Sequence, residues 1–533
     1  MLGPQLAALG PHSTGQPTVT SLAVADPGSL IQSVDWVAIA PPLIAALAAL
    51  AVLVTDLFLP ARHRKLLGAL AVGGLALALL ALLPLTGGSP RSTFCVRDTG
   101  CSYVADHFAL VFQLLALGGA LIAALLSMHT VDGPASDDGS AAGLPGGEYW
   151  FLLLSSATGA ALLPASRDLA TLVVALEVAS LPAFALVALR RDGRGAEAAL
   201  KFFLSSVTAT AVMLLGIGFV YAASGSLHLG AVAEGLAQAP AQLKPLAEAG
   251  AVLTLVGFAF KVAAVPFHFW VPDTYVGAPL PVAGYLSVVG KAAGLSGLAL
   301  VTTIAFRPYA HTWGLVLAVL AAVTMTVGNV GALRQRFDTR YSAVRLLAWS
   351  SVGQAGYLLV PLAAAGYART GADSLGATAA YALIYGVVNL GAFAVVAAVG
   401  RRAGTSVDEF RGLFARRRWT ALALAFFLLC LAGLPPGVIG LFGKVVVFRA
   451  AVDAGLGWLA VVMAVNVVIA LYYYLLWTAR LFAPEPSQDA VTAVAERRLP
   501  ASLTATLGLT ASVAVVLSVA PQLVLQVVGG TLF

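Results

Sequence analysis

Long apolar stretches of about twenty residues follow one another along most of the chain, and no other feature constrains its fold as strongly. Of the 533 residues, 60% are hydrophobic and only 10% are charged, which is far from the balance of water-soluble domains. A bilayer span needs roughly 20 apolar residues, and lipid admits only helices or closed barrels because backbone polar groups must be satisfied internally. The runs are long and unbroken, which favours helices over barrel strands. The sequence therefore predicts an all-α polytopic membrane protein.

The apolar stretches predict about fourteen transmembrane helices, arranged as two inverted five-helix repeats with flanking helices. The predicted spans are residues 36–58, 66–85, 108–128, 149–163, 168–189, 196–223, 249–275, 281–306, 313–333, 342–365, 375–399, 421–448, 458–482 and 503–527. We expect an extracytoplasmic extension over 1–35, helices 1–3 over 36–129, the first repeat (helices 4–8) over 148–306, the second repeat (helices 9–13) over 312–483, and helix 14 over 501–528.

Basic residues concentrate in the odd-numbered connections, as the positive-inside rule requires of cytoplasmic loops. These residues are Arg62, Arg64, Lys65, Arg190, Arg191, Arg194, Arg334, Arg336, Arg340, Arg401, Arg402, Arg411, Arg416, Arg417, Arg418, Arg480, Arg497 and Arg498. The exception is the third connection, which has Asp132, Asp137 and Asp138 but no basic residue. We therefore interpret the net charge of +6 as topology and not as a nucleic-acid surface, and we predict that both termini face the outside. The first 35 residues contain no Lys or Arg, so the charged region of a cleaved signal peptide is missing.

Two predicted spans are interrupted by proline, and each interruption lies near a lysine within the membrane. The seventh span is broken at Pro266, a few residues after Lys261, and the twelfth at Pro435 and Pro436, before Lys444. Proline removes a backbone donor and clashes with the preceding turn, so each helix should break there. An ordinary kink is the alternative. Paired broken helices in two halves of a chain are typical of transporters with an ion site at each break.

Four of the six lysines, Lys201, Lys261, Lys291 and Lys444, lie in or at the edge of apolar stretches. Arginine stays protonated at any accessible pH, whereas a lysine held away from water can release its proton. The pattern indicates proton movement, with Lys261, Lys291 and Lys444 as the main candidates. Lys201 is undecided because it lies only seven residues after Arg194, so its side chain can reach the membrane surface.

Glu177 lies in the middle of the fifth span, about nine residues from either end. A carboxylate at that depth costs about 2.5 to 3.5 kcal/mol unless it is paired or protonated, so we expect Lys261 or Lys201 to balance it. A switched pair between Glu177 and Lys261 would load and release a proton. His268 follows the first break, and the sequence leaves open whether it relays protons or packs among Phe267, Phe269 and Trp270.

The other polar residues within the spans do not indicate a metal, redox or nucleotide-binding site. Asn329, Gln354, Asn389 and Asn466 lie within spans, where they hold water or, more commonly, join helices by hydrogen bonds. Cys95 and Cys101 flank a short outside loop and could form a disulfide or remain as two thiols. No metal site, iron–sulfur cysteine cluster or nucleotide-binding loop is present in the sequence, so we expect this chain to bind no cofactor.

Several of these segments together resemble the antiporter-like membrane subunits of proton-pumping NADH:quinone oxidoreductase, known as respiratory complex I. The matching segments are residues 167–177, 260–273, 277–279 with Lys291, 346–351, 356–357 and 389–393. Within that family the N branch fits best, because Lys444 stands where the M branch is expected to have glutamate and the chain ends soon after span 14. The resemblance runs from span 1 to span 14.

The resemblance implies a function, partners and roles for residues. It implies that Glu177 and Lys261 form a modulating ion pair, that Lys291 is the central relay residue and that Lys444 is the terminal proton site. Relatives usually have histidine where this chain has Gln354, which cannot take up a proton but can order water. The resemblance implies a bacterial inner (plasma) membrane location, and as partners the antiporter-like subunit M and the small subunits K, J and A. Flavin, iron–sulfur clusters and quinone are expected in partner subunits. The alternatives are subunit M of the same complex and a subunit of a multi-subunit cation/proton antiporter.

Overall fold

Helices make up most of the computed structural model, which describes residues 34–60, 63–96, 100–131, 144–190, 192–367, 372–400, 405–484 and 499–524. Nearly all of the predicted N-terminal extension lies outside these residues. So do the acidic third connection and the basic residues Arg62, Arg191, Arg401, Arg402, Arg497 and Arg498.

The α-helices are α1 (Trp36–Phe58), α2 (Lys65–Leu80), α3 (His107–Val131), α4 (Gly146–Leu162), α5 (Leu169–Ala188), α6 (Gly193–Ser224), α7 (Leu229–Ala237), α8 (Lys244–Val262), α9 (Trp270–Gly277), α10 (Leu280–Tyr285), α11 (Lys291–Leu300), α12 (Ala310–Leu333), α13 (Ser342–Ala365), α14 (Ala372–Val399), α15 (Leu413–Arg416), α16 (Arg418–Ala432), α17 (Val438–Asp453), α18 (Gly457–Phe482) and α19 (Ala501–Val519). The π-helical segments are η5 (Leu286–Gly290) and η6 (Val301–Ala305), and the 3₁₀ turns are η3 (Leu83–Leu85), η4 (Leu163–Ala165), η7 (Arg307–Tyr309) and η8 (Val407–Phe410).

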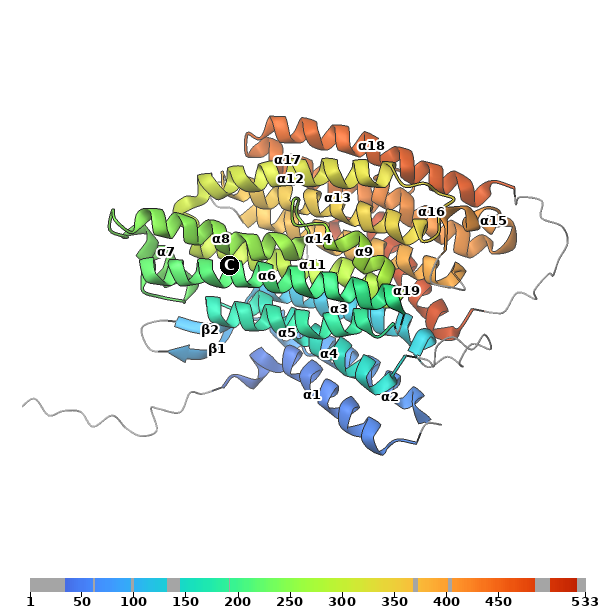
Figure 1. Cartoon of the computed structure of the whole chain (residues 1–533), viewed down its shortest axis with the longest axis horizontal. Helices are drawn as coiled ribbons and strands as arrows, with labels where there is room; N and C mark the ends of the chain where they lie inside the picture. The colour runs from blue at the N-terminus through green and yellow to red at the C-terminus, as the bar shows by residue number, and fades with distance from the viewer. Residues whose placement is uncertain are drawn as a thin grey trace, which may run out of the picture.

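The helices account for the predicted spans. Twelve helices in the described part of the chain are long and apolar enough to cross a membrane. The 17-residue α4 and the broken pair α16–α17 correspond to the other two predicted spans. The long helices lie side by side in one common direction, with the β-hairpin and α7 at one end of the bundle and α15 at the other (Figure 1). The chain is therefore a helical membrane protein, as its hydropathy predicts.

A short hairpin interrupts the otherwise helical structure, and the all-helical prediction missed it. Strands β1 (Arg91–Val96) and β2 (Gly100–Ala105) pair antiparallel, with Cys95 opposite Cys101. A disulfide joins these two cysteines. The hairpin is tied to α1, because Arg91 forms an ion pair with Asp35 at 2.7 Å and Asp35 caps the first turn of α1. A run of six strand-forming residues is too short to be recognised beside long apolar helices.

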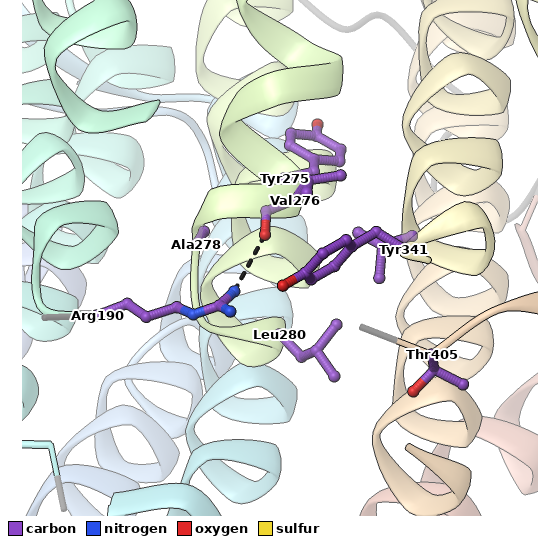
Figure 2. A pocket seen from close by; sticks show the side chains of 8 residues that line it. Arg190, Tyr275, Val276, Ala278, Leu280, Tyr341 and Thr405 are labelled. Atoms are coloured by element: carbon purple, nitrogen blue, oxygen red, sulfur yellow. Dashed lines mark hydrogen bonds between the residues drawn. The ribbon is translucent and has the colours of Figure 1, made fainter. Parts of the chain in front are cut away.

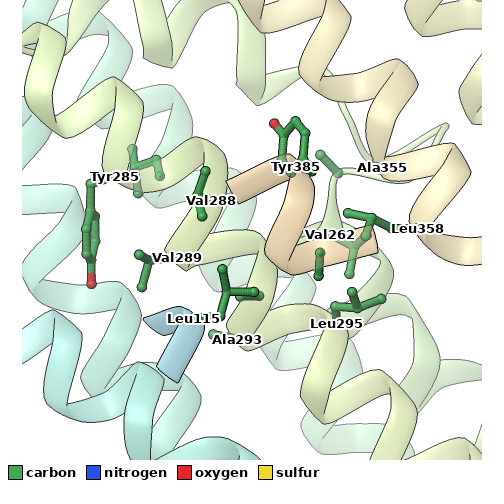
Figure 3. Close-up of a cluster of buried hydrophobic side chains, with 14 of the residues drawn as sticks. Leu115, Val262, Tyr285, Val288, Val289, Ala293, Leu295, Ala355, Leu358 and Tyr385 are labelled. Carbon is green, nitrogen blue, oxygen red and sulfur yellow. The ribbon is translucent and has the colours of Figure 1, made fainter. Parts of the chain in front are cut away.

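The centre of the bundle is α13 with the segment α10–η5–α11. Every residue of α13 is buried except Arg345 and Trp349, so α13 is enclosed by other helices along its length. Side chains from α3, α8, α11, α13 and α14 meet in this core, among them Leu115, Val262, Leu295, Leu358 and Tyr385 (Figure 3). Large apolar side chains remain exposed on outer helices such as α1, α6 and α18, as expected of surfaces that face lipid or other subunits.

Candidate functional site

Both predicted breaks are present, and they have similar local structure. Helix α8 ends at Val262 and is followed by Ala263 in the left-handed region, with φ +67°. Helix α16 ends at Ala432 and is followed by Gly433, with φ +82°. Each break contains one cis peptide bond before proline, at Pro266 and at Pro436. Pairs α8–α9 and α16–α17 run through the bundle in opposite directions (Figure 1), as the inverted-repeat prediction requires.

At each break, a side chain that follows the break donates to a carbonyl group in the last turn of the preceding helix, where the usual helical donors run out. In the first break, the indole Nε1 of Trp270 donates to the carbonyl of Phe260 at 3.1 Å. In the second, the ammonium group of Lys444 donates to the carbonyl of Ala432 at 2.6 Å. The C-terminal end of a helix favours positive charge. The break in α16–α17 therefore forms a site for the Lys444 ammonium.

Lys261 lies in the last turn of α8 and is buried. Its Nζ donates to the hydroxyls of Ser180 on α5 and Ser206 on α6, both at 2.7 Å. The rings of Phe184 and Phe202 lie 5.3 and 5.9 Å from Nζ, close enough for cation–π attraction. Among the described residues, the direct partners of the Lys261 ammonium group are therefore all neutral.

Glu177 does not form the predicted direct ion pair with Lys261. Its Oε1 accepts a hydrogen bond from the hydroxyl of Thr210 at 2.8 Å. Thr210 follows Ser206 by four residues on α6, and Ser180 follows Glu177 by three on α5. Such neighbours are about 5 to 6 Å apart along a helix. Glu177 and Lys261 thus lie at two ends of one hydroxyl-lined stretch between α5 and α6, with Glu177 near enough to contribute to the electrostatics of Lys261.

Lys291 begins α11 directly after η5, and its side chain crosses to α13. Nζ donates to the hydroxyl of Ser351 at 2.5 Å and also to the carbonyl of Ser351. The same hydroxyl is 2.8 Å from the phenol of Tyr385 and 3.5 Å from that of Tyr275. The Ser351 hydroxyl is therefore the centre of a polar network that joins Lys291 on α11 to α9, α13 and α14.

Lys261 and Lys291 are brought near one another by a glycine. Gly294 lies three residues after Lys291 on α11, and a Cβ there would lie 2.7 Å from the Cβ of Lys261. Real Cβ contacts are essentially never that close, so only glycine lets α8 approach α11 at this point. The backbones of the two lysines are thus about one turn of α11 apart, whereas their Nζ atoms point to different helices, that of Lys261 to α5 and α6 and that of Lys291 to α13.

A second polar network lies between Lys291 and Lys444. Gln354 accepts from the phenol of Tyr381 at 2.5 Å and donates to that of Tyr474 at 3.3 Å. A small cavity of about 10 Å³ is lined by Gln354, Tyr381 and Tyr385 together with Cys430 and Gly440, roughly the space that one water needs. Lys444 lies beyond this network, with Nζ 5.4 Å from the ring of Tyr357.

Two predicted site residues lie apart from these networks. Lys201 is half exposed and forms ion pairs with Glu197 at 2.7 Å and Asp273 at 2.9 Å, so it does not balance Glu177. His268 lies in the first break with its ring 5.6 Å from that of Trp349. No hydrogen bond links His268 to Glu177 or to a buried lysine, all of which lie in the described part of the chain.

The asparagines predicted within the spans have two different structural roles. Asn329 on α12 donates to Asn466 on α18 at 3.0 Å and accepts from Tyr473 at 2.9 Å, so these two asparagines join helices. Asn389 donates to Ser287 at 2.6 Å, and Tyr385 donates to the carbonyl of the same Ser287. Asn389 therefore supports the Lys291 network from α14. Among the described residues, no group of three or more His, Cys, Asp or Glu could hold a metal ion.

Comparison with known proteins identifies the family. Residues 166–470 match the family described as "NADH:quinone oxidoreductase/Mrp antiporter, TM", and this range covers more than half of the chain. The chain belongs to this antiporter-like family. Subunit N 2 of NADH-quinone oxidoreductase from Streptomyces griseus is 63% identical over 531 residues, which is 97% of each chain. Subunit N from Salinispora tropica is 47% identical over 468 residues, covering 86% of this chain and 87% of that protein.

Solved structures place the antiporter-like fold in two kinds of complex. A chain of respiratory complex I from Thermus thermophilus with bound aureothin superposes with a TM-score of 0.74 at 33% identity, covering 92% of this chain and 100% of that chain. A chain of the Mrp complex from Dietzia superposes with a TM-score of 0.78 at 20% identity, covering 93% and 96%. The second likeness shows the fold alone.

The sequence of this antiporter-like chain did not lead us to predict the serine and threonine hydroxyls that contact Glu177 and the lysines. Ser180, Ser206 and Thr210 are ordinary residues of apolar spans, and Ser351 is sixty residues from Lys291. Part of the signal was present, since Glu177 and Ser180 have the spacing of one helix face, as do Ser206 and Thr210. Ser351 depends on how α11 packs against α13, which local spacing does not reveal.

Proposed function

We propose that this chain is a proton-translocating membrane subunit of NADH:quinone oxidoreductase, of the subunit N type, with Lys261, Lys291 and Lys444 as its proton carriers. One observation carries the proposal. All three lysines are buried, and each donates to neutral oxygens with no carboxylate within ion-pair distance in the described structure. A lysine without a fixed counter-charge can gain and lose a proton as its surroundings change.

The order of the residues suggests a route. Gly294 brings the backbone of Lys261 against α11, on which Lys291 lies one turn away, and the network of Ser351, Tyr385, Tyr381 and Gln354 extends from Lys291 toward Lys444. We propose that the proton passes in this order. Gln354 orders water in this step because its amide does not titrate.

Glu177 is proposed to set when Lys261 holds its proton. While Glu177 accepts from Thr210, its charge stays about one helical turn away from Ser206 and Ser180. A shift of its side chain toward Lys261 would stabilise the ammonium, and a shift away would favour release. Moving one charge against 100 mV requires about 2.3 kcal/mol, which an ion pair at membrane depth can supply.

Orientation and partners follow from the same proposal. The basic odd connections face the cytoplasm and both termini face the outside of the inner (plasma) membrane. Subunits M, K, J and A are its neighbours, and flavin, iron–sulfur clusters and quinone belong to partner subunits. Lys201 fixes α9 through Asp273, and a relay role for His268 stays a prediction.

The proposal is tested on the intact complex in sealed vesicles. Lys291→Ala and Lys444→Ala should each lower the number of protons pumped per electron while the complex still assembles. Unchanged pumping in both variants would mean that the chain is a scaffold. The purified complex must also show flavin and iron–sulfur absorbance, whereas a cation/proton antiporter, the second candidate, would show neither.

A further inference from the structure

The short helix α9 reaches the surroundings of two buried lysines. At its first residue, the indole of Trp270 donates to the carbonyl of Phe260, which directly precedes Lys261 in the last turn of α8. Five residues later, the phenol of Tyr275 lies 3.5 Å from the serine hydroxyl on α13 to which Lys291 donates. A movement of α9 would therefore change the surroundings of both lysines.

Helix α9 fits closely against α6 at both of its ends. The indole of Trp270 stacks on the ring of Phe202, with the ring centroids 4.4 Å apart, and the Phe202 ring lies 5.9 Å from Nζ of Lys261. At the last residue of α9, a Cβ added to Gly277 would lie 2.3 Å from the Cβ of Ala198. The contact with α6 therefore determines where the Trp270 indole lies beside Lys261.

Three basic residues hold α9 near the odd-numbered connections. Asp273 on α9 forms ion pairs with Lys201 on α6 at 2.9 Å and with Arg345 on α13 at 3.7 Å. The guanidinium of Arg190 donates to the carbonyl of Val276, in the last turn of α9, at 3.1 Å (Figure 2). The C-terminal end of a helix favours such a positive charge. We call Asp273, Lys201, Arg345 and Arg190 the α9 clamp.

The length of α9 makes these contacts important. It has eight residues, whereas an isolated helix needs roughly 12 to 15 residues to form in water, and helices in proteins depend mainly on packing. The break at Pro266 separates α9 from α8, and its counterpart after the second break, α17, has sixteen residues. The position of α9 is therefore set by its contacts with α6 and α13. A single exposed ion pair contributes little, but the Asp273 carboxylate joins both of these helices to α9.

We propose that Asp273 is a positioning residue, which fixes α9 through the α9 clamp and thereby holds Lys261 and Lys291 in the arrangement that proton transfer requires. The carboxylate acts through its two basic partners and not by taking up a proton itself. The inference rests on the proposed function, because it assigns Asp273 a role at the same lysines.

The test removes the carboxylate from the α9 clamp in the intact complex. Asp273→Asn should accelerate hydrogen exchange of the α9 amides about fivefold or more, because two ion pairs are lost together, and it should lower the number of protons pumped per electron. Asp273→Glu keeps the charge and should restore both. Exchange is followed by mass spectrometry on the complex in detergent, and pumping is measured in sealed vesicles.

Glu197→Gln is the matched control. Glu197 forms an ion pair with the same Lys201 at 2.7 Å, but it lies on α6 and not on α9, so this variant should leave exchange of α9 and pumping unchanged. The double variant Lys201→Gln/Arg345→Gln removes the basic partners and keeps the carboxylate. It should behave as Asp273→Asn does.

Unchanged exchange in Asp273→Asn, or an equal effect in Glu197→Gln, would overturn the inference. Faster exchange with normal pumping would also overturn it, provided that Lys291→Ala lowers pumping in the same assay. Normal pumping in Lys201→Gln/Arg345→Gln would mean that the carboxylate acts on its own, which contradicts a positioning role. If Lys291→Ala and Lys444→Ala both pump normally, the proposed function fails and the positioning role fails with it, whereas the exchange data still decide whether the α9 clamp holds α9.

Discussion

At the scale of single residues, the buried lysines differ in the partners that hold them. The ammonium group of Lys261 donates to two hydroxyls and lies near the rings of several phenylalanines. That of Lys291 donates to the hydroxyl and the carbonyl of one serine, and that of Lys444 donates to a carbonyl at a helix end. These partners accept hydrogen bonds without fixing a charge. Such partners suit lysine amino groups that must both take up and release a proton.

Removing the hydroxyl of Thr210 should impair the control that Glu177 exerts. Thr210→Val keeps the shape of the side chain and deletes the hydrogen bond to Oε1. Hydrogen bonds to charged groups contribute about 1.5 to 3 kcal/mol, so we expect proton pumping to slow by about tenfold or more. Pumping is measured in vesicles at matched electron-transfer rates. Thr208→Val is the control, because the Thr208 hydroxyl donates to the carbonyl of Leu204 on the exposed face of α6, away from Glu177, and this variant should pump normally.

The contact between Asp35 and Arg91 should be sensitive to acid. The side-chain hydrogen bond from Arg91 lowers the pKa of Asp35, and the backbone amides of the first turn of α1 lower it further. Because the pKa of Asp35 is lower in the folded protein than the usual aspartate value near 3.8, its ion pair stabilises the folded state fully above that usual value. This stabilisation is lost as the pH falls through the folded-state pKa. The protection factors of the amides of residues 36–39, in which the intrinsic pH dependence of exchange is divided out, should therefore fall below about pH 4. In Asp35→Asn the side chain can still cap the helix but does not titrate, so its protection factors should not change over this pH range, and a fall in that variant would contradict this assignment.

At the scale of elements, close helix contacts place the lysines. Gly294 is the clearest case, since a methyl group there would overlap Lys261. Overpacking of this kind costs about 1 to 3 kcal/mol. Gly294→Ala should therefore lower the thermal stability of the complex and separate α8 from α11, with reduced pumping per electron.

The matched control is Gly218→Ala on α6, where an added Cβ meets nothing within 4 Å. Replacing an open helical glycine by alanine stabilises by about 0.5 to 1 kcal/mol, so this variant should be at least as stable as the parent. Equal behaviour of the two alanine variants would show that the approach of α8 to α11 does not matter.

Sequence patterns predicted some elements and not others for physical reasons. Hydropathy suffices for the spans because lipid imposes length and apolarity, and Pro266 and Pro436 mark the breaks because proline cannot continue a helix. The partner of Glu177 could not be predicted, since choosing Thr210 over Lys261 depends on how α5 rotates against α6. Lys201 shows the same limit, because Asp273 reaches it only through the docking of α9.

At the scale of the whole molecule, the distribution of basic residues predicts which end of the bundle faces the cytoplasm. Cysteine labelling tests it cleanly, because Cys430 is buried and Cys95 and Cys101 are joined. Gln238→Cys, between α7 and α8, should react with an impermeant thiol reagent added outside intact cells. Arg336→Cys, between α12 and α13, should react only after the membrane is permeabilised. The reverse pattern would invert the topology.

Lys261→Arg tests whether the buried lysines of this chain carry protons. Arginine keeps the positive charge but stays protonated, so it separates a proton carrier from a fixed charge. Protons pumped per electron are measured in sealed vesicles containing the intact complex, with Lys261→Ala alongside. Arginine is expected to impair pumping nearly as much as alanine. Normal pumping with arginine at this position would contradict it.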